Sequence, residues 1–360
     1  MTKLFRYKKR AMTIVLLTAI LLISACGNEA KTTNTKSNSN DKAATTVPAD
    51  AEKTASAGGT ELDLTKVTLV IGQTGWGSYE EGFKAAGVDD TPYKVEYQVF
   101  QGGNLQLEAM AAKHLDLALT SEIPPIFASQ AANGGNFKII AVSQGTTLQQ
   151  EVVIPKDSPI KTVADLKGKK VAYVKATTAH YFLLKILENA GLTWNDIEPV
   201  ELSTADGLSA LISGSVDALA SYGNAIITSH QKGATTLASA KDILSGNFPV
   251  ATTPANIEDP LKHAAIVDYL KRINRYHEWA RAHEQDWAEI VAKATKQDVT
   301  QALETYHNGE QQRPTKIIPT SPEAIASQQD VADALTSVGL LTSKIDVSQI
   351  WSNAFDDELK

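Results

Sequence analysis

Short runs of β-branched and aliphatic residues alternate with Ala- and Leu-rich segments of helical period, and this alternation restricts the fold more than any other feature of the chain. Strands separated by helices build largely parallel sheets with helices on both faces. The sequence therefore predicts an α/β fold. We expect strands at Val67–Ile71, Lys94–Val99, Leu115–Leu119, Lys138–Val142, Gln150–Ile154, Lys170–Val174, Pro199–Leu202 and Ala218–Ser221.

Helical signals dominate the chain beyond Asp259, where strand signals fade. The stretch from Leu62 to Lys360 is longer than one core usually organises, so two lobes are expected. The formal net charge of -7 and the scattered basic residues argue against nucleic-acid binding. We expect helices at Leu105–Lys113, Ile126–Ala132, Leu261–Ala282, Trp287–Ala294, Val299–Tyr306 and Pro322–Leu335.

Residues 1–26 have the layout of a secretory signal, in which basic residues precede the apolar run Met12–Ile23. As a helix this run spans roughly 18 Å, well short of a hydrocarbon core of about 30 Å. The order Leu22-Ile23-Ser24-Ala25-Cys26 resembles the lipobox of bacterial lipoproteins. That resemblance implies acyl chains on Cys26 and attachment to the extracytoplasmic face of the cell membrane. The alternative is an ordinary signal peptide followed by an incidental cysteine.

Cys26 is the only cysteine of the chain, so no intrachain disulfide can form. Residues 27–61 contain Lys, Thr, Asn, Ser, Ala and Asp with few bulky apolar side chains. Such a segment cannot bury enough surface to offset its ordering entropy, and we expect a flexible tether.

Hydroxyl, amide and aromatic side chains follow several of the expected strands, where open parallel sheets bind their ligands. Groups of this kind suit a compact anion, because helix N-termini nearby offer unpaired N–H groups and a partial positive charge. The alternative for Thr177 and Thr178 is a role as N-caps alone. The candidate binding residues are Gln73, Trp76, Thr120, Ser121, Thr177, Thr178, Tyr222 and Asn224.

Catalytic signals are weak. The chain has no Gly-x-Ser-x-Gly elbow and no Walker lysine loop, so we expect a binding protein without cofactor or catalytic residues. His277 and His283 are six residues apart, and a helix turns their side chains about 240° from each other, which favours a solvated helix face over a metal site. His180 is either a neutral donor to a ligand or a surface residue.

Longer segments of the chain match a known family. Together they resemble the substrate-binding proteins of alkanesulfonate, taurine and nitrate importers, and the resemblance extends from Val67 to about Trp287. The clearest matches are Phe100–Asn104, Leu115–Ala118, Thr120–Ala128, Ile154–Val171, Ala190–Thr193 and Ser213–Ala218.

The resemblance implies a two-lobe periplasmic-binding-protein fold of type II, with extra C-terminal helices and a hinge that closes over the ligand. Crossing strands are then expected near Gln149–Val153 and Phe248–Thr252. Residues 62–149 begin the first lobe, 150–248 form the second, and 249–360 return to the first. The implied partners are an importer permease and its ATPase, and we expect a monomer.

The resemblance also implies roles for single residues. Family contacts to the sulfonate fall on Gln73 and Trp76, on Thr120 and Ser121, and on Ala176, Thr177, Thr178 and His180. Trp76 and Tyr222 would shape the pocket for the ligand's tail. The sequence departs from the family at Ala176, where glycine is usual, and at Ser221–Ala225, which replaces a segment containing an acid and a ring.

The implied ligand is an aliphatic sulfonate. Taurine, nitrate and a thiamine-precursor pyrimidine are alternatives within the binding class, and an enzyme on the same scaffold is the rival from another class. Taurine would favour a carboxylate near its ammonium group, and Glu122 or Asp206 would supply it.

Overall fold

The computed structural model describes residues 62–131 and 134–360. The expected signal segment, the lipidation site Cys26 and the expected tether lie outside these ranges. Within them, no helix is both long enough and apolar enough to cross a membrane.

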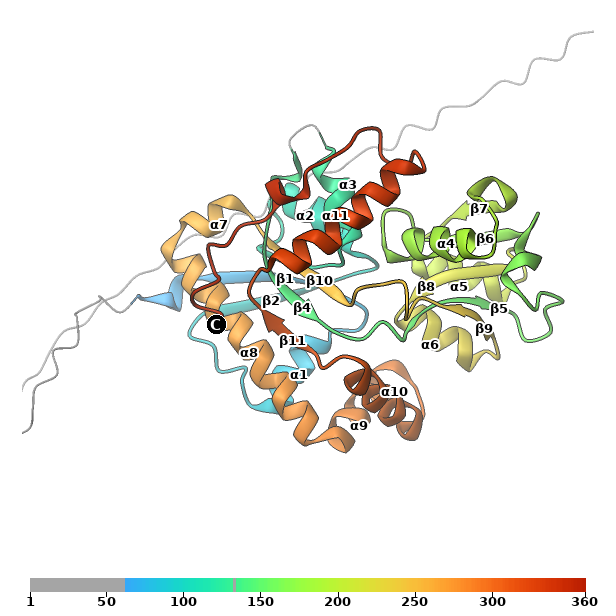
Figure 1. The fold of residues 1–360 in the computed structure, drawn as a ribbon. Coiled ribbons are helices and arrows are strands. Elements are labelled where there is room, and N and C mark those ends of the chain that lie inside the picture. The colour runs from blue at the N-terminus through green and yellow to red at the C-terminus, as the bar shows by residue number, and fades with distance from the viewer. Residues whose placement is uncertain (1–61, 132–133) are drawn as a thin grey trace, which may run out of the picture. The chain divides into compact units, whose positions relative to one another are not determined.

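Two mixed β-sheets form the frame of the described chain (Figure 1). The α/β prediction is confirmed, since helices separate most of the strands. The first sheet has the order β11-β4-β10-β3-β1-β2 and the second has the order β7-β6-β8-β5-β9. The first comprises β1 (Thr68–Thr74), β2 (Lys94–Phe100), β3 (Leu117–Leu119), β4 (Lys138–Gln144), β10 (Asn247–Thr252) and β11 (Lys316–Ile318). The second comprises β5 (Gln150–Ile154), β6 (Lys170–Tyr173), β7 (Glu198–Glu201), β8 (Ala218–Tyr222) and β9 (Thr235–Ser239).

The chain passes between the two sheets twice, at residues 145–149 and 240–246. The Gly145 N–H donates to the Gly246 carbonyl oxygen over 3.0 Å, so the two passages run side by side. The expected crossing segments instead lie in β5 and β10, the strands that the chain enters after each passage. Both strands pair antiparallel with their neighbours.

Most of the predicted helices begin and end close to the predicted positions, but α10 continues to Gln312, six residues beyond its predicted end, and α1, α5, α6 and α7 were not predicted. Pro260 occupies the first turn of α8, and the Asp259 carboxylate accepts from the N–H groups of Leu261 and Lys262, which explains where that helix begins. The helices are α1 (Ser78–Ala86), α2 (Gly103–Ala111), α3 (Ile123–Ser129), α4 (Thr178–Asn189), α5 (Thr204–Ile212), α6 (Asn224–Gln231), α7 (Pro254–Glu258), α8 (Pro260–Ala282), α9 (Glu284–Thr295), α10 (Val299–Gln312) and α11 (Pro322–Ser337). Single 3-10 turns are η1 (Leu64–Lys66), η2 (Gly134–Asn136), η3 (Val163–Leu166), η4 (Trp194–Asp196) and η5 (Val347–Ile350).

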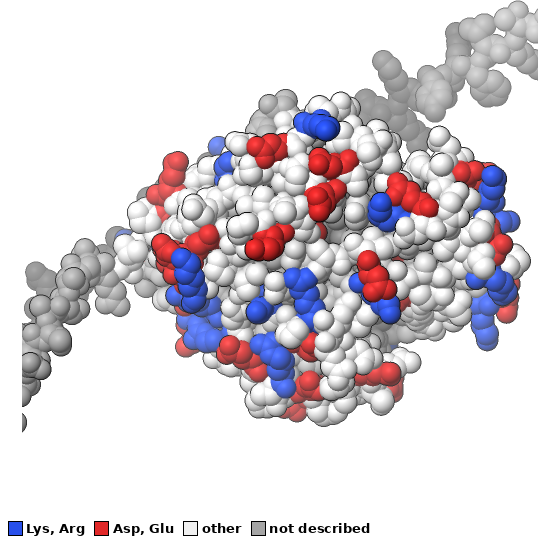
Figure 2. Space-filling model, viewed as in Figure 1, with Lys and Arg blue, Asp and Glu red and all other residues white. Residues whose placement is uncertain are grey.

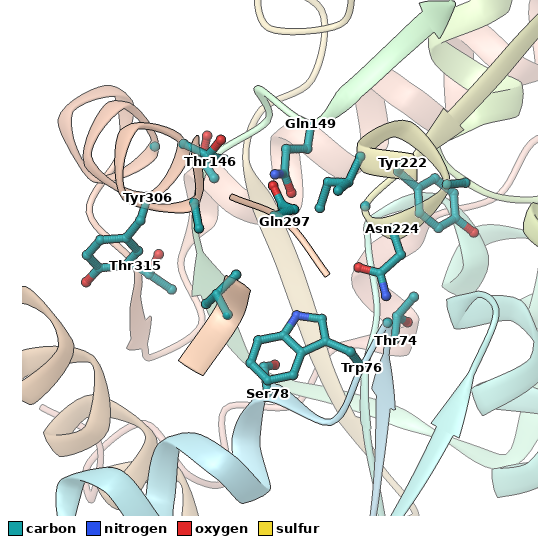
Figure 3. A pocket seen from close by; sticks show the side chains of 18 of the residues that line it. Thr74, Trp76, Ser78, Thr146, Gln149, Tyr222, Asn224, Gln297, Tyr306 and Thr315 are labelled. Carbon is teal, nitrogen blue, oxygen red and sulfur yellow. The ribbon is translucent and has the colours of Figure 1, made fainter. Parts of the chain in front are cut away.

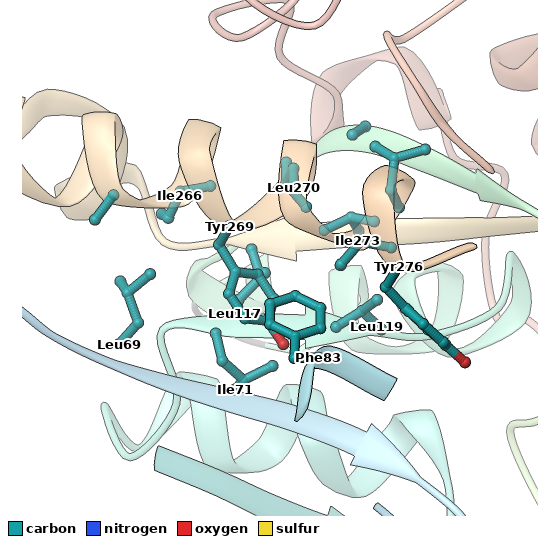
Figure 4. Packing of buried hydrophobic residues seen from close by; sticks show 14 of the residues in the cluster. Leu69, Ile71, Phe83, Leu117, Leu119, Ile266, Tyr269, Leu270, Ile273 and Tyr276 are labelled. Atoms are coloured by element: carbon teal, nitrogen blue, oxygen red, sulfur yellow. The ribbon is translucent and has the colours of Figure 1, made fainter. Parts of the chain in front are cut away.

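Helices cover both faces of the first sheet. On one face α1 and α8 pack against β1 and β3, where Phe83 and Tyr269 meet at a ring-centroid distance of 5.1 Å (Figure 4). On the other face α2, α3 and α11 enclose a second cluster that includes Met110 and Leu335. This sheet is therefore buried on both faces, as its apolar strands require.

The second sheet is also covered on both faces. Leu183 of α4 belongs to the cluster on one face, and Leu211 of α5 and Ile226 of α6 belong to the cluster on the other. On the surface, Lys and Arg are interspersed with Asp and Glu over the face seen in Figure 2. That face has no basic stripe of the kind that nucleic-acid binding uses.

Candidate functional site

Two neighbouring cavities that share part of their lining open between the sheets, and residues of both lobes line them. We call the smaller one, of about 360 Å³, the polar chamber and the larger one, of about 480 Å³, the aromatic chamber. Ligand sites of small-molecule binding proteins have volumes of about 300 to 1,000 Å³. The residues that line both chambers are Thr74, Ser78, Thr146, Gln149, Tyr222, Gly223 and Thr315.

Neutral hydrogen-bonding groups line the polar chamber. Among the described residues that line it, none is Asp, Glu, Lys, Arg or His. Burial raises the pKa of the Tyr79 and Tyr222 hydroxyls, so both stay uncharged near neutral pH. The polar groups of this chamber include Thr120, Ser121, Ser143, Gln150, Thr177 and Thr178.

Four helices, α1, α2, α4 and α6, have their N-termini at these chambers, and in none of them does the N-cap side chain accept a hydrogen bond from the first turn. In α1 the Gln73 side chain from β1 accepts from the Tyr79 N–H instead, so the unsatisfied first turns are those of α2, α4 and α6. The N-cap residues of the four helices are Gly77, Gly102, Thr177 and Gly223. Away from the chambers, α7, α8 and α11 are each capped by their own Ser, Thr or Asp side chain. First-turn N–H groups that no side chain satisfies are left to bind an anion.

Thr177 occupies the N-cap position of α4 but does not make the capping bond. Its hydroxyl donates instead to the Val174 carbonyl oxygen over 2.7 Å. Thr178 is 6% exposed, and its hydroxyl makes no hydrogen bond to any residue that the structure describes. Thr177 therefore occupies the N-cap position, as that interpretation requires, but its side chain does not accept a hydrogen bond from the first turn of α4.

Aromatic rings line the larger chamber (Figure 3). The rings of Trp76 and Trp287 lie 5.8 Å apart at an angle of 32°, and Trp287 meets Tyr276 edge-on at 5.1 Å. Figure 3 shows Trp76, Tyr222 and Tyr306 around the same cavity, each from a different element. Helices α8, α9 and α10 supply Tyr276, Trp287 and Tyr306 to this wall, and they come from the C-terminal part of the chain.

The aromatic chamber holds no free charge among its described lining residues. Glu310 is the one carboxylate there, and it accepts from the Thr315 hydroxyl at 2.6 Å and from the Arg281 guanidinium at 3.1 Å. Burial, assisted by the positive charge of Arg281, lowers the pKa of His277 to about 3, so this side chain is neutral. His277 is 9% exposed, so the expectation of a solvated helix face is wrong for this residue, whereas His283 is exposed.

The structure brings most of the predicted site residues together. Trp76 and Asn224 line the aromatic chamber and Tyr222 lines both chambers. Thr120, Ser121, Thr177 and Thr178 line the polar chamber.

Gln73 and His180 line neither chamber. The Gln73 side chain is 1% exposed and accepts from the Tyr79 N–H at 3.2 Å, so it holds the start of α1 in place. His180 is 3% exposed and packs among the rings of Tyr173, Trp194 and Phe127. Burial lowers its pKa to about 4, and the expectation of a surface residue is wrong.

The two carboxylates proposed for an ammonium group also lie outside both linings. Glu122 is buried, which raises its pKa, and it accepts from the Ser245 hydroxyl at 2.6 Å. Asp206 accepts from the Ser203 hydroxyl at 2.7 Å in the first turn of α5. In the described residues, no group of three or more His, Cys, Asp or Glu side chains is arranged to hold a metal ion.

Sequence reasoning missed several lining residues. Thr74 and Ser78 line the aromatic chamber and lie within two residues of the predicted Gln73 and Trp76. Thr74 is the last residue of β1 and directly follows Gln73, so the prediction was wrong by one residue at this strand end. Gln149 lies on the first passage between the sheets. Tyr306 and Trp287 carry no local signal beyond helical spacing, because packing from distant parts of the chain brings them to the cavity.

Further hydrogen bonds join the lobes around the chambers. The Gln101 side-chain oxygen, on the loop after β2, accepts from the Thr204 hydroxyl of α5 at 3.1 Å. The Gln231 amide of α6 donates to the Lys296 carbonyl oxygen after α9 at 3.0 Å. The described arrangement is therefore a closed one, with the lobes in contact on two sides of the cavity.

Comparisons with known proteins agree with this architecture. A family model described as "ABC transporter, phosphonate, periplasmic substrate-binding protein" matches residues 89–317. Over 270 residues the chain is 34% identical to a protein of Escherichia coli (strain K12) named as an aliphatic sulfonates-binding protein, with 72% of this chain and 79% of that protein covered.

Two solved structures share the fold. The alkanesulfonate-binding protein SsuA from Xanthomonas axonopodis pv. citri, solved bound to MOPS, is 25% identical with a TM-score of 0.71 and covers 79% of this chain and 98% of its own. The desulfurization enzyme DSZB is 16% identical with a TM-score of 0.58 and covers 81% of this chain and 97% of its own. Because an enzyme shares the fold, the fold alone does not separate binding from catalysis.

Proposed function

Since the chain belongs to the family of periplasmic substrate-binding proteins of ABC importers, we propose that it captures an aliphatic sulfonate outside the cytoplasm and delivers it to the importer's permease. The ATPase of that importer would drive uptake. Closure of the two lobes over the ligand would present the surface that the permease recognises.

The composition of the polar chamber carries this proposal. A sulfonate is fully ionised near neutral pH and brings no proton, so it needs donors and no acceptor. Hydroxyls, amides and uncapped helix N-termini are such donors, and no described carboxylate lines this chamber. A phosphonate, the ligand named by the family model, keeps an ionisable proton near neutral pH and favours a site with an acceptor.

The alternatives fit this lining less well. Taurine carries an ammonium group, and Glu310, the one carboxylate among the described residues of the two linings, is already held by Arg281 and Thr315. Nitrate is small and would leave the aromatic chamber unfilled. A thiamine-precursor pyrimidine would stack on Trp76 but would leave the uncapped helix N-termini without an anion.

We infer binding without catalysis. Acyl transfer or hydrolysis needs a nucleophile with an adjacent base. His277 is the one histidine among the described lining residues, and its pKa, lowered to about 3, makes it a weak base. None of the described lining residues is a cysteine that could act as the nucleophile. The relatives named for sulfonate binding support the same inference.

The membrane attachment proposed here rests on the sequence around Cys26, which lies outside the described residues. A diacylated cysteine would hold the protein at the extracytoplasmic membrane face, and residues 27–61 would serve as the tether. We propose that it acts as a monomer.

Thermal unfolding with a ligand panel tests the function. Residues 26–360 carrying Cys26→Ser would be heated alone and with methanesulfonate, butane-1-sulfonate, methylphosphonate, taurine, nitrate or a thiamine-precursor pyrimidine. A ligand present at a hundred times its dissociation constant stabilises the fold by about 2.7 kcal/mol. We expect that shift with the alkanesulfonates and little with methylphosphonate at the same concentration. A shift with nitrate or the pyrimidine alone would reassign the protein, and equal shifts with phosphonate and sulfonate would remove the argument from the polar chamber.

A further inference from the structure

The aromatic chamber is much larger than the tail of a short alkanesulfonate requires. A dry cavity of about 150 Å³ holds benzene. The aromatic chamber has about 480 Å³, roughly three times that volume. A methyl or butyl tail would therefore leave most of it to water, whereas two fused rings would fit.

The walls of this chamber suit a flat ring. Aromatic pairs prefer offset or edge-to-face arrangements with centroids about 4.5 to 7 Å apart. Trp76 is tilted by 32° against Trp287, so the two indoles are not stacked face to face. Trp287 and Tyr276 belong to the buried core, but Trp76 and Tyr306 are only partly buried at its edge. Their rings are free to contact a ligand.

The charges of the chamber exclude a charged tail. Both oxygens of Glu310 are occupied by Thr315 and Arg281, and His277 is neutral. The other polar groups that the described residues contribute to this lining are uncharged, such as the amides of Asn224 and Gln297. A tail with an ammonium or carboxylate group would enter this cavity without a partner, at the cost of its desolvation.

The aromatic chamber lies next to the polar chamber, and the two share part of their lining. Tyr222 and Gln149 line both chambers, so one molecule can occupy the two at once. Its anionic head would lie near Thr178, and its tail would extend toward Trp76 and the helices α9 and α10.

From the volume, the rings and the absence of free charge, we propose that this protein selects sulfonates with an uncharged aromatic tail of about two fused rings. This inference rests on the proposed sulfonate-binding function and extends the ligand class from aliphatic to aromatic sulfonates. Trp76 is the specificity-determining residue for the tail, and Thr178 belongs to the head-group site.

Calorimetric titration of residues 26–360 carrying Cys26→Ser tests this selection. The ligands are methanesulfonate, butane-1-sulfonate, benzenesulfonate and naphthalene-2-sulfonate. We expect affinity to rise along this series, with naphthalene-2-sulfonate binding at least about tenfold more tightly than butane-1-sulfonate. If butane-1-sulfonate binds as tightly as naphthalene-2-sulfonate, the aromatic selection is wrong and the sulfonate function stands. If none of the four binds, the proposed function fails together with the inference.

Two variants test whether the aromatic chamber causes the preference for an aromatic tail. Trp76→Leu removes the ring, and Ile227→Phe fills part of the chamber from α6, so each should lower the ratio of naphthalene- to methanesulfonate affinity by about fivefold or more. Trp279→Leu is the matched control, because Trp279 stacks on His283 and does not line the chamber. A ratio that stays unchanged in both variants, or falls equally in Trp279→Leu, would overturn the assignment.

Discussion

The Tyr222 hydroxyl donates a hydrogen bond to the Gln101 carbonyl oxygen over 3.1 Å, and this bond joins the end of β8 in one lobe to the loop after β2 in the other. Tyr222 also lines both chambers. A Cβ atom on Gly102 would come within 2.9 Å of the same hydroxyl, so glycine permits this approach. One side chain thus touches the cavity and holds the lobes together.

Tyr222→Phe tests that contact. The substitution keeps the ring and removes the bond between the lobes, so the closed form loses about 0.5 to 1.5 kcal/mol relative to the open form. We expect sulfonate affinity to fall about 2- to 10-fold in calorimetric titration. Tyr181→Phe is the control, since the Tyr181 hydroxyl of α4 lines neither chamber. An affinity equal to that of the parent protein would show that the bond does not contribute to closure.

Thr178→Val tests the head-group site. The valine matches the shape of threonine and removes a hydroxyl that no described residue engages. A hydrogen bond to a charged group contributes about 1.5 to 3 kcal/mol, so affinity for methanesulfonate should fall about 10- to 100-fold. Thr336→Val in α11, whose hydroxyl donates to the Ala332 carbonyl oxygen, serves as the control. Should both variants bind as the parent does, the anion lies elsewhere.

His180 makes the stability of the fold depend on pH. Burial, with a smaller effect of Lys175, lowers its pKa from 6.5 to about 4 in the folded protein. The unfolded chain therefore binds more protons between these values, and the free energy of unfolding falls as pH drops from about 6.5 toward 4. The expected loss from this residue is about 2 to 4 kcal/mol, and above pH 6.5 the effect is absent.

Urea unfolding of His180→Gln and the parent protein at pH 7 and pH 4.5 measures this effect. The variant should lose less stability on acidification than the parent does. His114→Gln, at an exposed position, should lose as much as the parent. If acidification destabilises His180→Gln as strongly as the parent, the imidazole is not the group that titrates.

Cys26→Ser tests the membrane attachment. Without the thiol no acyl chain can be added, so the protein should move from the membrane fraction to the soluble extracytoplasmic fraction. Metabolic labelling with palmitate should mark the parent chain and not the variant. A variant that stays with the membrane would indicate that the apolar run Met12–Ile23, rather than a lipid, holds the protein.

The sequence was informative where local patterns determine structure. The predicted strands correspond to β1 through β8 because β-branched runs bounded by turns are a local signal. Strands β9 and β11 were missed: Thr235–Ser239 has no buried residue, and Lys316–Ile318 has only three residues. Their pairing with β5 and β4 is decided by tertiary contacts.

The residues of the candidate site also fall into those that local sequence patterns predict and those that depend on tertiary packing. Thr177 and Thr178 were predictable because a strand leads directly into a helix there. His277 was not, because helical spacing does not reveal that α9 and α10 cover that face of α8. Gln73 and Thr74 are adjacent on a strand, so they face opposite sides of the sheet, and an error of one residue selects the wrong side.

The hydrogen bond between Gly145 and Gly246 has a mechanical consequence. Two connections bonded to each other constrain the lobes more than one flexible connection would, because sliding and twisting would stretch both chains at once. Rotation about the line through the pair is the movement that these two connections resist least. A permease that distinguishes the loaded from the empty protein would then need to sense a single angle.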